Sequence, residues 1–168
     1  MSPTPKPFRG RLRVIRPIQE DCIGFHPDRI EVKRVSGRWK IVEGSHWILD
    51  FENLEAEARL AFSIIKHYRM DQICFVGRPD PSMTYFLSRR RAPKGPFPGE
   101  DAIAFNPKKI EVKQISGRWK IVEGSHWIMD FETNAGEARE AFQIIKKYGF
   151  KYICFVGRPD PSLTYFRK

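Results

Sequence analysis

The feature that most constrains this chain is an internal repeat with a fixed spacing of eighty residues. The eleven residues from Gly37 to Trp47 return unchanged from Gly117 to Trp127. Without a gap, residues 20–86 align with residues 100–166, and 47 of the 67 aligned positions are identical. Self-similarity of this kind defines the unit of folding. We therefore predict a tandem duplication of one small unit.

The repeat divides the chain into four segments. We predict a basic, proline- and arginine-rich arm at residues 1–19, repeat 1 at 20–86 and repeat 2 at 100–168. Residues 87–99 are rich in proline, glycine and positive charge, which predicts an exposed and fairly stiff spacer. A unit this small buries only a modest fraction of its surface, so we expect the two copies to pack together as a pseudo-dimer.

The spacing of apolar residues predicts an α+β fold. Alternation of apolar and charged residues at 30–35 is typical of a half-buried strand, and Ser36-Gly37 is a hairpin-turn signal. The strands predicted in repeat 1 are 30–35, 38–42, 46–51, 72–76 and 83–86. Before the last two strands, apolar residues recur at helical spacing from Ala58 to Tyr68. Each copy is thus predicted to be a β-β-β-α-β-β unit, with an antiparallel sheet and one helix packed on it.

The predicted helices carry different end signals in the two copies. In repeat 1 we expect Asn53 to cap the helix, whereas in repeat 2 Asn134 and Glu137 have the spacing of a capping box. Gly149 supplies a left-handed stop after the second helix. Arg69 stands at that position in repeat 1, where a side chain is strained if the geometry is kept. We therefore expect repeat 1 to be the less stable copy.

The net charge of +10 is concentrated outside the aligned segments 20–86 and 100–166, which together carry −1. Basic arms of this kind attract polyanions without reading a sequence. The residues predicted to bind a polyanion are Arg9, Arg11, Arg13, Arg16, Arg89, Arg90, Arg91 and Lys94. The folded units have no net attraction of this kind.

The three cysteines argue against a disulfide framework. Cys74 and Cys154 hold equivalent positions in an apolar run, where a buried free thiol is the ordinary interpretation, and Cys22 has Ala102 as its counterpart. No apolar run approaches the ~20 residues that span a bilayer, and no signal peptide is recognisable at the N-terminus. The default expectation is a cytoplasmic protein, with export by another route left open.

The first candidate site is the loop Gly-Arg-Pro-Asp-Pro-Ser, which occurs in both copies. An arginine beside an aspartate can grip a polyol, a carboxylate or a backbone. The candidate ligand-binding residues are Arg78, Asp80 and Ser82, with Arg158, Asp160 and Ser162 in repeat 2. The alternative is a rigid hairpin in which Arg78 pairs internally with Asp80 or with an acid of the helix.

The second candidate site is the segment Ser-His-Trp, at His46 and Trp47 and again at His126 and Trp127. Adjacent strand residues point to opposite faces, so the serine and histidine do not form a catalytic pair. The set also holds too few ligands for a metal. In its alternative role the histidine is hydrogen-bonded at a turn.

The tryptophans of these segments have two alternative roles. Regular alternation places Trp47, Leu49 and Phe51 on one face of their strand, and core packing is the ordinary role there. An exposed tryptophan is instead a flat platform for a sugar ring or a base.

These features favour a non-catalytic binding protein. No constellation has both the residue types and the spacing of an active site, and we expect no cofactor and no metal. Two equivalent sites on one body multiply a weak affinity, which suits a repetitive ligand such as a polysaccharide or other glycan, or a multimeric protein partner. The alternatives are a nucleic-acid-binding protein that acts through the basic arm and linker, and a structural subunit of a larger assembly.

Overall fold

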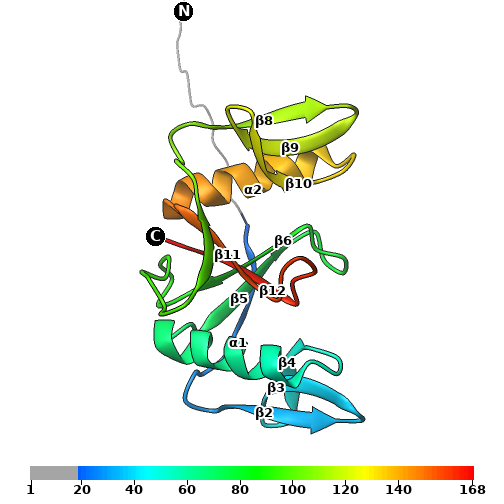
Figure 1. Ribbon diagram of the computed structural model, residues 1–168, viewed down its shortest axis with the longest axis vertical. Coiled ribbons are helices and arrows are strands. Elements are labelled where there is room, and N and C mark those ends of the chain that lie inside the picture. The colour runs from blue at the N-terminus through cyan, green and yellow to red at the C-terminus, as the bar shows by residue number, and fades with distance from the viewer. Residues whose placement is uncertain (1–18) are drawn as a thin grey trace, which may run out of the picture.

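Two similar units face each other across a shared centre in this computed structural model, which describes residues 19–168 (Figure 1). In repeat 1 the elements are β1 (Asp21–Gly24), β2 (Ile30–Val35), β3 (Arg38–Glu43), β4 (His46–Asp50), α1 (Glu55–Tyr68), β5 (Gln72–Val76) and β6 (Met83–Leu87). In repeat 2 they are β7 (Asp101–Ala104), β8 (Ile110–Ile115), β9 (Arg118–Glu123), β10 (His126–Asp130), α2 (Ala135–Tyr148), β11 (Tyr152–Val156) and β12 (Leu163–Arg167). The predicted α+β tandem duplication is confirmed.

Each unit contains two three-stranded antiparallel sheets in place of one. The sheet β2-β3-β4 is the predicted meander, and Val35 pairs with Arg38 across the Ser36-Gly37 turn. The second sheet has the order β1-β5-β6 and includes a strand, β1, that was not predicted. Its four residues show no alternation of apolar and charged side chains, and its partner β5 lies about fifty residues further along the chain.

The two repeats share their hydrophobic cores. Residues of β5 and β6, including Cys74, Val76 and Tyr85, belong to the same buried cluster as Ile144 and Ile145 of α2. The reverse cluster joins strands of repeat 2 to α1 of repeat 1. In Figure 1 the four strands β5, β6, β11 and β12 accordingly lie between the two helices, and each meander covers its helix from outside. The strands β5 and β6 therefore pack against α2 of the other copy, and β11 and β12 pack against α1.

Two polar clusters tie the repeats together in a reciprocal way. The Glu20 carboxylate accepts hydrogen bonds from Tyr85 of its own repeat at 2.6 Å and from Tyr148 of repeat 2 at 2.8 Å. The Glu100 carboxylate accepts from Tyr165 of its own repeat at 2.5 Å and from Tyr68 of repeat 1 at 2.7 Å. Contacts that are repeated with the partners exchanged are the mark of an approximate twofold axis.

Both ends of α2 agree with the prediction, whereas the N-terminal end of α1 does not. Asn134 caps α2, since its Oδ1 accepts from the Glu137 N–H at 3.0 Å, and Gly149 ends that helix with φ of 66°. The prediction for Asn53 is wrong, because α1 begins one residue later and Leu54 holds the cap position without a side-chain hydrogen bond.

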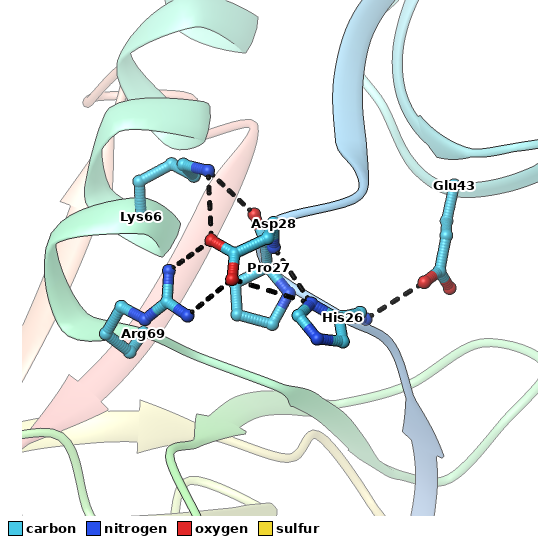
Figure 2. A network of polar contacts seen from close by, with 6 residues as sticks. All are labelled: His26, Pro27, Asp28, Glu43, Lys66 and Arg69. Atoms are coloured by element: carbon cyan, nitrogen blue, oxygen red, sulfur yellow. Dashed lines mark hydrogen bonds and ion pairs between the residues drawn. The ribbon is translucent and has the colours of Figure 1, made fainter.

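Arg69 ends α1 in the predicted left-handed conformation, with φ of 55°. Its guanidinium donates both terminal N–H groups to Asp28, at 2.6 and 2.9 Å (Figure 2). This contact holds the pKa of Asp28 well below its usual range. Repeat 2 has Lys108 in place of Asp28 and Gly149 in place of Arg69, so the strained residue and its ionic partner occur together in one copy only.

The prediction for the cysteines is wrong in repeat 1. β1 places Cys22 directly opposite Cys74 of β5, and the two form a disulfide. In repeat 2 Ala102 is opposite Cys154, which is buried as a free thiol. The error follows from the strand that was not predicted.

The linker packs more closely than a spacer. Ala92 and Pro93 are buried, and the backbone of Lys168 donates to Pro93 at 2.9 Å and accepts from Gly95 at 3.2 Å. The expectation of an exposed spacer is therefore wrong for this part of the linker. In residues 19–168, neither helix is long and apolar enough to cross a membrane.

Candidate functional site

One groove of about 630 Å³ lies between the two repeats and takes its lining from both. Its lining includes Trp47 of β4, Trp127 of β10 and residues of the two central sheets. We call the lining residues of each repeat one rim of the groove. The lining positions shared by the two copies are Trp47 and Trp127, Ile48 and Ile128, Leu49 and Met129, Asp50 and Asp130, Ile73 and Ile153, Phe75 and Phe155, Pro81 and Pro161, Ser82 and Ser162, Met83 and Leu163, and Thr84 and Thr164; Phe166 completes the lining. We call this space the tryptophan groove.

A β-bulge in each meander exposes the tryptophans. Trp47 pairs with Val42 and Leu49 pairs with Ile41, so Ile48 is an extra residue between the two pairs. The bulge shifts Trp47 to the face opposite Leu49, whereas regular alternation predicts one shared face. Repeat 2 has the same shift between Trp127 and Met129. As a result the Trp47 and Trp127 residues are 58% and 59% exposed.

A lysine makes a cation–π contact with each exposed indole ring, which we call lysine-braced. Lys40 Nζ lies 4.7 Å from the centroid of the Trp47 ring, and Lys120 Nζ lies 4.8 Å from that of Trp127. Each ammonium lies over its indole ring, and neither lysine lines the tryptophan groove. This contact favours the observed orientation of each ring before anything binds.

The charged residues of the groove lining are two aspartates, each matched by an arginine. Arg38 Nε donates to Asp50 Oδ2 at 2.8 Å, and Asp50 Oδ1 accepts from the Glu52 N–H at 2.9 Å. Burial alone would raise the pKa of Asp50, but these hydrogen bonds outweigh it and lower the pKa. Arg118 and Asp130 repeat the arrangement at 2.8 Å. Both carboxylates are thus ionised and neutralised at neutral pH, and the groove offers no unmatched positive charge to a polyanion.

The arginines of the two loops pair with acids of their own repeat. Arg78 grips the carboxylate of Asp21 through two N–H groups, with Nε to Oδ2 at 2.7 Å, and its guanidinium lies 4.7 Å from the Phe75 ring centroid. Arg158 and Asp101 form the same pair. The internal partner predicted for Arg78 was Asp80 or a helix acid, and the partner is a residue of β1.

The serines of the loops cross between the repeats. Ser82 donates to Glu137 of α2 at 2.5 Å, and Ser162 donates to Glu57 of α1 at 2.5 Å. Each helix acid lies against a glycine, Gly77 or Gly157, where an added Cβ would collide with the carboxylate. Identity of the loops between copies therefore has a structural reason in addition to any ligand.

The structure separates the remaining site residues from the groove. Arg78, Asp80, Arg158 and Asp160 do not line it, nor do the exposed His46 and His126. Of the predicted ligand-binding residues, Trp47, Ser82, Trp127 and Ser162 are brought together in it. Arg89, Arg90, Arg91 and Lys94 are exposed on the linker, while Arg9, Arg11, Arg13 and Arg16 lie outside the described residues.

One group of potential metal ligands and one free thiol occur in the part of the chain that the structure describes. Glu20, Cys22 and Cys74 lie close enough together to share an ion. The disulfide removes both sulfurs as thiolate ligands, and the carboxylate already holds Tyr85, Tyr148 and Lys147. Burial raises the pKa of the Cys154 thiol to about 12, so this thiol stays protonated.

Comparisons with protein-family models, with curated proteins and with solved structures find no match to this chain.

Proposed function

We propose that this chain is a non-catalytic binding protein whose ligand lies in the tryptophan groove and contacts both repeats at once. The observation that carries the proposal is the pair of exposed, lysine-braced indoles at the two rims of one groove. Exposing the large apolar ring of a tryptophan to water is energetically unfavourable, and tryptophans are among the residues that most often anchor a binding surface. The volume of about 630 Å³ lies in the usual range for ligand pockets.

A glycan fits the chemistry of this lining better than a multimeric protein partner does. Each indole presents a flat apolar face, and a sugar ring offers a matching face of C–H groups. Beside the indoles stand the hydroxyls of Ser82, Thr84 and their counterparts, together with the carboxylates of Asp50 and Asp130, which accept from sugar hydroxyls. The two equivalent sets of contacts then lie in a single groove, and one ligand molecule contacts both tryptophans at once.

Calorimetric titration with a panel of neutral linear hexasaccharides tests this function. We expect at least one member to bind, and the double variant Trp47→Ala/Trp127→Ala to lose that binding. The matched control is His46→Ala/His126→Ala, which changes exposed side chains next to the tryptophans but outside the groove. Equal loss in both double variants would contradict the proposal, as would a panel without a binder.

A second candidate function is binding of nucleic acid through the basic segments. Arg89, Arg90 and Arg91 are consecutive and exposed, which supports it. Affinity for single-stranded DNA should then fall steeply with salt and should drop on neutralising these three arginines. Affinity that is insensitive to salt would exclude this candidate.

A further inference from the structure

The two rims of the tryptophan groove are equivalent, and this constrains how a linear ligand lies across it. Ten pairs of lining residues are related by the eighty-residue repeat, and eight of these pairs are identical in type. The reciprocal contacts between the repeats relate the two rims by an approximate twofold axis. A linear ligand that crosses this axis therefore points one end toward the rim with Trp47 and its other, different end toward the rim with Trp127.

A directional chain cannot make identical contacts on both sides of a twofold axis. It keeps equal energy in its two orientations, however, because turning it end for end exchanges the equivalent rims. Stacking on an indole tolerates this reversal, since a sugar ring presents C–H groups whichever way the chain runs. Hydrogen bonds of the Thr84 and Thr164 hydroxyls also tolerate it, because a hydroxyl both donates and accepts. The hydroxyls of Ser82 and Ser162 donate to Glu137 and Glu57, so they accept from the ligand in either orientation.

The charge of the lining limits the class of chain. Its charged members are Asp50 and Asp130, whose partners Arg38 and Arg118 do not line the groove. Phosphates or uronates would find no cation among the lining residues, whereas neutral sugars meet acceptors for their hydroxyls.

Building on the proposed function, we infer that the tryptophan groove binds one neutral linear glycan and accepts it in both chain directions with equal affinity. The two tryptophans then contribute equally. Trp47→Ala and Trp127→Ala should each weaken binding by about tenfold or more, with less than about a threefold difference between them.

The direction can be read by fluorine NMR. The protein is labelled with 5-fluorotryptophan, and the hexasaccharide that binds best carries a nitroxide at its reducing end. The resonances of Trp47 and Trp127 should broaden to the same extent in one sample. Trp39 and Trp119, which are half-buried and do not line the groove, serve as internal controls.

The outcomes separate the inference from the function on which it rests. Broadening of one groove tryptophan alone would overturn the inference and leave the proposed function standing. Failure of every neutral hexasaccharide to bind would overturn both. Tighter binding of a thymidine hexanucleotide in a manner that depends on Trp47 would also overturn both, because it would make the groove a nucleic-acid site.

Discussion

Removing the Glu100 carboxylate should be among the most damaging changes of charge in this protein. Glu100 accepts from Arg167 Nε at 2.7 Å, and the two side chains are 3% and 8% exposed. Substituting Glu100→Ala leaves the guanidinium of Arg167 buried without the carboxylate that pairs with it, and deprives Tyr68 and Tyr165 of their acceptor. Breaking a buried ion pair from one side costs about 3–5 kcal/mol, which we expect for this variant.

Glu20→Ala is the matched control from the other repeat. Glu20 has the same two kinds of tyrosine partner, but its cation is Lys147, whose side chain is 50% exposed and can return to water. The remaining cost is that of tyrosine hydroxyls without an acceptor, about 1–3 kcal/mol. The difference between the two variants therefore isolates the desolvated arginine.

Urea unfolding at neutral pH, followed by tryptophan fluorescence, measures both costs. A double variant, Glu100→Ala/Arg167→Leu, places at 167 the residue that stands at the equivalent position 87 and removes the stranded charge. We expect it to recover about 2 kcal/mol of the loss. The reasoning is refuted if Glu100→Ala costs no more than Glu20→Ala, or if the second substitution restores nothing.

Three further predictions follow from the contacts between elements. Hydrogen bonds outweigh burial and lower the pKa of both Glu20 and Glu100 below 4.5, so the stability that they contribute is present above pH 4.5 and is lost as pH falls through their folded pKa values. The urea concentration at the unfolding midpoint should therefore decrease when the pH is lowered below 4.5, and it should decrease less in a Glu20→Gln/Glu100→Gln variant. Cys22→Ala opens a loop with a separation of 52 residues and should lower the free energy of unfolding by about 4 kcal/mol, while a reducing agent should destabilise the parent chain and leave this variant unchanged. Gly77→Ala should cost more than Gly37→Ala in the same unfolding assay, because both have positive φ but only at Gly77 does the new Cβ meet the Glu137 carboxylate; equal costs would remove the proposed role of this glycine between the repeats.

The sequence predicts the meander well because its determinants are local. Alternation at 30–35 and the Ser36-Gly37 turn fix strand and register within a few residues. The left-handed position of Arg69 is equally local, since Gly149 marks it in the other copy. Whether repeat 1 is the less stable copy remains a prediction.

The errors share a different cause, which is contact between distant segments. β1 shows no periodicity of its own, and once it is missed the partners of Cys22 and Arg78 are missed as well. An alignment of two copies also cannot tell a contact within a repeat from one between repeats. Ser82 and Glu137 illustrate this, since Glu57 of repeat 1 is the same residue type at the same repeat position.

The sequence predicts several residues of the candidate site but does not predict how they come together. Trp47 and Ser82 were among the predicted residues, but their union with Trp127 and Ser162 in one groove depends on the packing of the repeats. The exposure of Trp47 depends on the bulge at Ile48, which has no glycine or other marker in the sequence. No pattern within one repeat predicts a site that is built from two.

The most direct test of one shared groove is the number of ligand molecules bound per chain. Calorimetric titration of the full chain with its best-binding neutral hexasaccharide should give one molecule per chain, and each single tryptophan variant should weaken that one event. Two molecules per chain, with Trp47→Ala removing one and leaving the other at full affinity, would contradict the account, because each repeat would then carry a complete site of its own.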